Sequence, residues 1–175
     1  MKTTPYDRLP KVPRFHLTSL SVHEGQSLPR PHRSAQGDGG GQDLSPQLEW
    51  KATPAGTCSW AVTLFDPDAA GPDGFWHWVV LDLPPAITLL PAGAGTPGSK
   101  ILPAGAWQLA NDSGRDGYLG AAPPPHTGRH RFIFAVHALD VRSLGLDNDA
   151  QPADLLPHLE VHTIARASLV CWAEH

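Results

Sequence analysis

Residues 59–66 read SWAVTLFD, and five of the eight side chains in this stretch are apolar. In an extended chain Trp60, Val62 and Leu64 would lie on one face, and the residues between them on the other. Apolar side chains occur in both sets, so neither face is suited to contact with water. The stretch therefore predicts a β-strand that is covered on both of its faces.

Two further stretches, 75–83 and 130–139, have the same near-continuous apolar character and predict two more buried strands. Pro84 and Pro85 end the first of them, because proline lacks the N–H that a strand uses for pairing. Shorter strands are expected at 15–19 and 48–50. Together these stretches predict a mainly β domain.

The C-terminal part of the chain shows a different period. Six residues recur at the spacing of one helical face: Val161, Ile164, Ala165, Ser168, Leu169 and Trp172. Pro157 suits the first turn of such a helix, where its missing N–H would have no partner in any case. The spacing predicts a C-terminal helix that packs beside the strands.

The length of 175 residues is that of one domain, which we expect to span residues 14–175. Residues 1–13 are polar and interrupted by prolines, which predicts an extended N-terminal arm. Four glycines within 36–42 predict a flexible loop. The proline and glycine content of 86–105 predicts a long surface connection.

Composition excludes several classes of protein. The net charge of −4 gives no basic footprint for nucleic acid. No apolar stretch reaches the roughly 18 residues of a transmembrane helix, and the N-terminus lacks the apolar core of a secretory signal. The chain has only two cysteines, Cys58 and Cys171, which favours a cytoplasmic location. A single disulfide between them remains an open alternative.

Acids and histidines gather where the predicted strands begin and end. Asp66 and Asp68 flank a proline after the first strand, while His77 lies between two tryptophans in the second and His130 begins the third. A buried histidine needs a partner or a cavity, because an unpaired buried polar group costs about 1–3 kcal/mol. A carboxylate could orient it and fix its tautomer. We predict one small pocket for an anionic group. The alternatives are a plain Asp-Pro-Asp turn and a hydrogen-bonded core histidine.

The segment before His130 has the properties of a pocket wall. Residues 123–125 are three prolines, which form a stiff surface that loses little entropy on binding. Glycines such as Gly120 let the backbone approach a ligand closely. Strand alternation places His130 and Arg131 on opposite faces, so only one of them is expected in the pocket. We expect Arg131 to form a structural ion pair instead.

Five blocks of sequence, in one order, resemble those of a known family. The blocks are Ser45-Pro46-Gln47-Leu48-Glu49-Trp50, Asp66-Pro67-Asp68-Ala69, His77-Trp78-Val79-Val80, Gly117-Tyr118-Leu119-Gly120 with the prolines and His130-Arg131-Phe132, and Val161-His162-Thr163-Ile164-Ala165. They resemble the phosphatidylethanolamine-binding proteins, which include the Raf kinase inhibitor proteins and the plant flowering-time regulators. The composition is similar to that of the compact bacterial members.

The resemblance implies a β-sandwich of two antiparallel sheets with a C-terminal helix and short flanking helices. It also implies a small surface pocket that holds phosphate, acetate or a phosphoethanolamine headgroup. The implied pocket residues are Asp66, Asp68, Phe75, His77, Gly120, Pro124, His130 and Phe132. Phe132 stands where the family usually has tyrosine, so one hydroxyl donor to the ligand is missing. No cofactor, metal or catalytic residue is implied.

The function that we expect from the resemblance is non-catalytic binding of a phosphoryl or carboxylate anion. Regulation of a protein kinase or a protease, and assembly as a homodimer, are further implications. Two alternatives use the same four residues, Asp66, Asp68, His77 and His130. They could act as the acid–base groups of a small hydrolase, or they could ligate a divalent metal ion.

Overall fold

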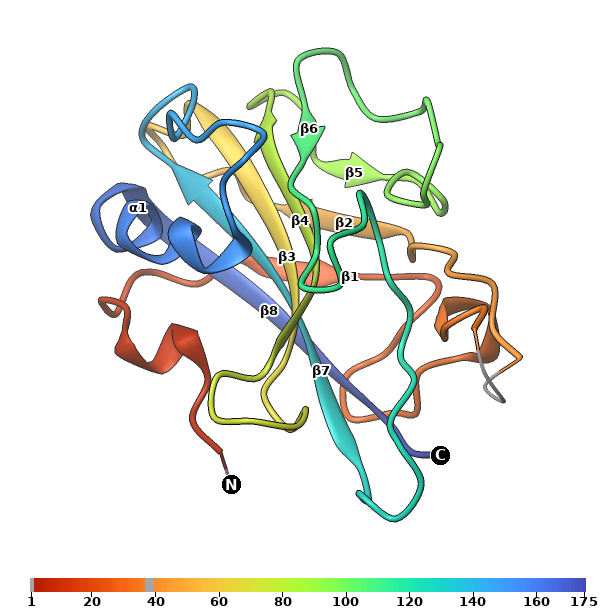
Figure 1. Cartoon of the computed structure of the whole chain (residues 1–175). Helices are drawn as coiled ribbons and strands as arrows, with labels where there is room; N and C mark the ends of the chain where they lie inside the picture. The colour runs from red at the N-terminus through yellow and green to blue at the C-terminus, as the bar shows by residue number, and fades with distance from the viewer. Residues whose placement is uncertain (1, 37–39) are drawn as a thin grey trace.

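The centre of the fold is a five-stranded antiparallel sheet with the strand order β6-β4-β3-β7-β8 (Figure 1). The computed structural model describes residues 2–36 and 40–175. Three strands at the middle of the sheet are β3 (Ser59–Asp66), β4 (Phe75–Leu83) and β7 (His130–Leu139). Their bounds confirm the prediction from apolar runs, and every residue of β3 is buried.

A three-stranded antiparallel sheet, ordered β1-β2-β5, forms the second layer. Its strands are β1 (His16–Thr18), β2 (Leu48–Lys51) and β5 (Leu89–Leu90). The main core lies between the layers, where the Trp50 and Trp60 rings meet edge to face with their centroids 5.5 Å apart. These two antiparallel sheets confirm the predicted mainly β sandwich.

The other face of the large sheet is covered by helical segments. The helix α1 (Leu155–His162) follows the 3-10 turn η4 (Pro152–Asp154), and its buried Leu155 and Leu159 lie one turn apart. Both leucines pack in a cluster with Phe65 and Trp76 of the sheet. Since β3 contributes to both cores, its coverage on two faces is confirmed.

The predicted C-terminal helix is too long, because most of its stripe belongs to a strand. α1 ends at His162, and β8 (Thr163–Ala173) pairs with the whole of β7. Burial along β8 alternates with a period of two, and apart from Leu169 its buried residues are small: Thr163, Ala165, Ala167, Cys171 and Ala173. Larger side chains such as Ile164 and Trp172 dominated the helical pattern although they lie on the more exposed face. Because most of the buried residues are small, the period-of-two pattern of the strand was hard to recognise in the sequence.

The outer edge of β8 is covered by the N-terminal part of the chain. Single parallel bridges join Arg14 to Arg166 and Ser27 to Trp172. Backbone bonds of 2.7 Å from Gly25 N to Val170 O and from Leu28 N to Trp172 O extend this cover. The strand edge is thus protected from pairing with another chain.

The N-terminal arm is not extended throughout. Residues Pro5–Arg8 form the 3-10 turn η1, whose capping box joins the backbone N of Thr4 to Asp7 Oδ2 at 2.7 Å. Pro5 suits its first position. Tyr6 and Leu9 pack against the cluster that contains Phe65, so the arm contributes to the core.

The connection between β4 and β6 (Trp107–Gln108) is also less superficial than predicted. It contains β5, and both Leu90 and Ala94 are fully buried. A further 3-10 turn, η2 (Arg30–His32), precedes the glycine-rich segment. Residues 37–39 of the predicted flexible loop lie outside the described residues.

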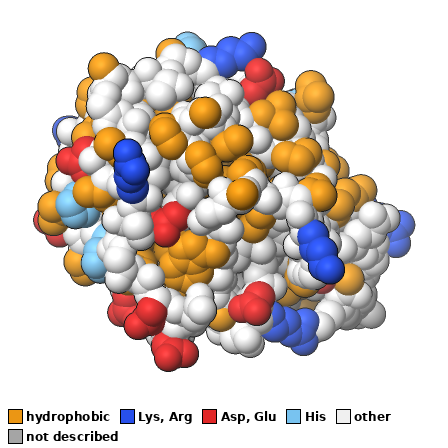
Figure 2. Space-filling model, turned by 90° about the horizontal axis from the view of Figure 1, so that it is seen from above, with side chains coloured by type: hydrophobic (Ala, Val, Ile, Leu, Met, Phe, Trp, Pro, Cys, Tyr) orange, Lys and Arg blue, Asp and Glu red, His pale blue; other side chains and the backbone are white. Residues whose placement is uncertain are grey.

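β5 and β6 lie at the top of the molecule in Figure 1. Seen from above, hydrophobic side chains gather over this face, and acidic and basic side chains lie mainly around its margin (Figure 2). The exposed large hydrophobic residues include Leu89 and Ile101 from the connection around β5. Within residues 2–36 and 40–175, no helix has the length and apolar character needed to cross a bilayer.

Candidate functional site

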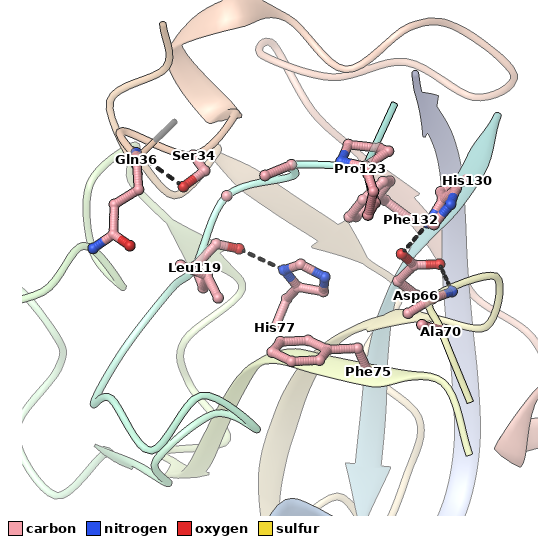
Figure 3. A pocket seen from close by; sticks show the side chains of 14 residues that line it. Ser34, Gln36, Asp66, Ala70, Phe75, His77, Leu119, Pro123, His130 and Phe132 are labelled. Carbon is pink, nitrogen blue, oxygen red and sulfur yellow. Dashed lines mark hydrogen bonds and ion pairs between the residues drawn. The ribbon is translucent and has the colours of Figure 1, made fainter. Parts of the chain in front are cut away.

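A pocket of about 380 Å³ opens beside the end of β3 and the starts of β4 and β7 (Figure 3). Seven of the eight predicted site residues line it: Asp66, Phe75, His77, Gly120, Pro124, His130 and Phe132. Pro123 of the predicted proline wall also lines it, and the remaining lining residues were not predicted: Ser34, Gln36, Ala69, Ala70, Leu119 and Ala122.

Antiparallel pairing explains why distant residues converge here. β3 pairs with β4 on one side and with β7 on the other, so the end of β3 lies beside the start of both neighbours. Asp66 is directly opposite Phe75 in the register. The period of two then places His77 on the same face as Phe75, and Phe132 on the same face as His130.

His77 presents one free ring nitrogen to the pocket. Its Nδ1 lies 2.9 Å from the carbonyl oxygen of Leu119, so Nδ1 carries a hydrogen and donates it. Burial lowers the pKa of His77 to about 4, against the opposing effect of that hydrogen bond. At neutral pH the ring is uncharged, and Nε2 keeps a lone pair. Nε2 has no hydrogen-bond partner within the described residues, and it points across the pocket (Figure 3).

Two aromatic rings fix the plane of the His77 imidazole. The centroid of Phe75 lies 4.7 Å from that of His77, and the centroid of Phe132 lies 5.1 Å away on a T-shaped approach. Phe132 is 1% exposed. These rings exclude water from the walls and hold His77 in one orientation.

Asp66 pairs with His130 and not with His77. Its Oδ2 lies 2.8 Å from His130 Nδ1, and both side chains are 4% exposed. Its Oδ1 accepts bonds from the backbone N of Asp68 and of Ala69, at 2.7 and 3.0 Å. The carboxylate therefore holds both the histidine and the loop that follows β3.

His130 Nε2 forms a hydrogen bond with a residue that the sequence analysis did not identify. It lies 2.9 Å from Thr127 Oγ1, and that hydroxyl donates to the carbonyl of Pro124 at 2.7 Å. Asp66 accepts from Nδ1. Both nitrogens of the His130 ring therefore have a partner within the protein, unlike those of His77. The sequence feature that could have indicated this contact is a hydroxyl residue three positions before His130, in a proline-rich loop.

Asp68 lies outside the pocket. Its two carboxylate oxygens each lie 2.8 Å from a nitrogen of the Arg131 guanidinium, and Oδ2 also accepts from the Arg131 backbone N at 2.9 Å. The side-chain hydrogen bonds from Arg131 lower the pKa of Asp68. The predicted structural ion pair of Arg131 is confirmed, and its partner is a residue that we had expected to contact the ligand.

The wall opposite His77 is built from segments far apart in sequence. The backbone N of Gly120 donates to Asp43 Oδ1 at 2.7 Å, and the backbone N of Ser34 donates to the carbonyl of Ala121 at 2.9 Å. Ser34 and Gln36 reach the pocket through this contact. No pattern in residues 34–43 marked them, because their role depends on the packing of two loops.

The geometry bears on the two alternative chemistries. The order Asp66, His130 and Thr127 is that of a hydrolytic triad, but the Thr127 hydroxyl is also bonded to the carbonyl of Pro124 at 2.7 Å, and Thr127 does not line the pocket. Within residues 2–36 and 40–175, no group of three or more acids, histidines or cysteines is placed to hold a metal ion. Cys58 and Cys171 are both free thiols.

Comparison with known proteins covers nearly the whole chain. Residues 18–173 match the family model described as phosphatidylethanolamine-binding protein. The chain is 41% identical over 153 residues to UPF0098 protein YbhB of Escherichia coli, a match that spans 87% of this chain and 96% of YbhB.

Solved structures share the fold. The crystal structure of E. coli YbcL, described as a new member of the mammalian PEBP family, has a TM-score of 0.89 and 36% identity over 93% of this chain and 99% of YbcL. A PEBP homolog of Chlamydia trachomatis, CT736, has a TM-score of 0.75 and 31% identity over 93% of this chain and 98% of its own. Agreement in sequence and in fold over these lengths leads to one conclusion. The chain belongs to the phosphatidylethanolamine-binding protein family.

Proposed function

We propose that this protein binds a small oxyanion that carries a proton, such as a phosphate monoester, through His77. The observation that carries the proposal is the unpaired Nε2 of His77, which faces a pocket of about 380 Å³. The Asp66 carboxylate is engaged by His130 Nδ1 and by two backbone N–H groups, which reduces its repulsion of an anion. Binding without turnover is favoured because the Thr127 hydroxyl, which is bonded to His130, does not line the pocket.

The protonation state of His77 decides which oxyanion fits. A neutral imidazole whose Nδ1 is committed to Leu119 offers only an acceptor at Nε2. A fully ionised oxyanion also offers only acceptors, so one proton must lie between the two. A phosphate monoester has its second pKa at about 6, so about a tenth of it still carries that proton at pH 7. A carboxylate has a pKa of about 4, so only about a thousandth of it is protonated at the same pH.

Phosphate recognition is tested by removing the imidazole. We expect His77→Ala to weaken the binding of phosphoethanolamine at pH 7 by at least about tenfold, since a hydrogen bond to a charged group contributes about 1.5–3 kcal/mol. Titration followed by two-dimensional NMR measures the affinity, and the spectrum of the free variant verifies its fold. His23→Ala is the control, because His23 is exposed and does not line the pocket. Equal affinities for the two variants would overturn the proposal.

The shared proton makes binding depend on pH. Above about pH 6 the ligand has lost its second proton, and His77, whose pKa is lowered to about 4 by burial, cannot supply one. The complex must then take up one proton, so affinity for phosphoethanolamine should fall by about tenfold for each pH unit between 7 and 8.5. Calorimetry in buffers of different ionisation enthalpy should show uptake of one proton per ligand. A flat pH profile, or one that is unchanged in His77→Ala, would contradict this.

A further inference from the structure

A second cavity lies beneath the N-terminal arm, on the outer face of β7 and β8. Its volume is about 510 Å³, within the range of small-molecule sites. Figure 1 shows the arm, in red, passing from the N-terminus beside α1 towards β1. Leu9 and Val12 of the arm line one side of the cavity, and Ile133 and Val170 of the sheet line the other. The cavity therefore has two apolar walls and is separate from the pocket of His77.

Three cationic side chains line the same cavity, together with one acidic side chain. They are Lys11, Arg14 and Arg166, accompanied by the single acid Asp7. Asp7 Oδ2 accepts from the backbone of Thr4. Within residues 2–36 and 40–175, none of the three cations forms an ion pair with a carboxylate. The cavity thus carries an excess of positive charge between apolar walls.

Arg166 contacts neutral side chains among the described residues, and none of these contacts is with a carboxylate. Its Nε donates to His137 Nδ1 at 3.2 Å, and its Cζ lies 5.8 Å from the centre of the Tyr6 ring. Its Nη2 is buried and has no hydrogen-bond partner in the described part of the chain. Burial without an acid lowers the pKa of Arg166. His137 is itself neutral, because burial keeps its pKa well below the usual range.

We propose that the arm cavity binds a small organic carboxylate with an apolar body. The positive charges of Arg14 and Arg166 would attract the carboxylate, and a guanidinium N–H forms a charge-assisted hydrogen bond with such a group. Arg14 lies beside Arg166, to which a parallel bridge joins it, and its Nη2 donates to Ser168 Oγ at 3.2 Å. Leu9, Val12 and Val170 would contact the apolar body. The ligand would supply the counter-charge that the protein lacks.

The proposal is tested with phenylacetate as the probe and 2-phenylethanol as its uncharged counterpart, by NMR titration at pH 7. Phenylacetate should shift the backbone amides of Arg166, Ser168 and Val170, and it should bind at least about tenfold more tightly than the alcohol, as expected for a charge-assisted contact. Absence of shifts at these amides, or equal affinity for the alcohol, would overturn the proposal.

Two variants and a control separate a binding role from a structural one. Arg14→Gln alters an exposed side chain and should reduce phenylacetate affinity at least about fivefold without loss of fold. Arg166→Met should abolish detectable binding. Arg142→Gln removes an exposed arginine that does not line the cavity, and it should leave the affinity unchanged. Equal affinity in Arg14→Gln and Arg142→Gln would contradict the proposal. Phosphoethanolamine binding through His77 should persist in all three variants.

Discussion

Asp66→Ala is expected to lower the free energy of unfolding by about 3–5 kcal/mol, because it removes one partner of a buried pair and leaves His130 Nδ1 without its acceptor. The same substitution removes the acceptor for the backbone N of Asp68 and of Ala69, which holds the rim of the pocket. Urea denaturation followed by tryptophan fluorescence measures the loss.

Asp66→Asn is the informative comparison. Its amide can donate to His130 Nδ1 when the ring carries its hydrogen on Nε2, and Nε2 then donates to Thr127. All partners are then satisfied, so we expect a loss of only about 1–2 kcal/mol. Asp68→Ala removes a pair whose side chains are 19% and 22% exposed, and it should cost about 1 kcal/mol. Equal costs for Asp66→Ala and Asp68→Ala would show that the buried pair does not stabilise the fold.

Gly120→Ala is expected to destabilise the protein by about 3 kcal/mol through overpacking. A Cβ at this position would overlap the backbone carbonyl of Arg33 and approach the backbone N of Ser34. The Ser34 segment cannot move away easily, because its backbone N is bonded to Ala121 and a parallel bridge joins Arg33 to Ala121. Since Ser34 and Gly120 both line the pocket, phosphoethanolamine affinity should fall together with stability.

Gly98→Ala is the control for the effect of adding a methyl group. Gly98 has a φ of +78° and open space around its Cα, so only the left-handed backbone opposes an alanine. That strain costs about 1–2 kcal/mol. Thermal unfolding of the two variants, followed by circular dichroism, compares them. A smaller loss for Gly120→Ala than for Gly98→Ala would mean that the two loops can separate at low cost.

Strands that are buried on both faces were predictable to the residue. β3, β4 and β7 consist of near-continuous apolar runs with clear ends, such as Pro84 after β4. The strand β8 was not predictable from the same criterion, because alanine, threonine and cysteine fill all of its buried positions except that of Leu169. A search for hydrophobic periodicity gives most weight to large apolar side chains. A buried position in a strand, however, accepts any side chain that fits the space available.

The candidate site was predictable where its residues lie at strand ends. The resemblance to the family and the strand pattern together brought Asp66, His77 and His130 into one pocket. The pairing within that group was not predictable. Asp66 and Asp68 are separated by one residue, yet the first is bonded to His130 and the second to Arg131. Which carboxylate faces the pocket depends on the geometry of the turn at Pro67. The sequence predicts that turn, but it does not predict the direction in which each side chain points.

The cover on the outer edge of β8 has a consequence for synthesis. Trp172 and its partner Gly25 are separated by 147 residues, so the N-terminal segment leaves the ribosome long before the strand that it covers. At about 5–20 residues per second, that interval lasts roughly 7–30 s. During that time residues 14–28 of the nascent chain have no β8 to pair with. β7 also remains unpaired on one edge until β8 has been synthesised. A translation product that ends before Thr163 would therefore expose the edge of β7. Its residues 14–28 would have no strand to cover, and we expect chaperones to bind such a product.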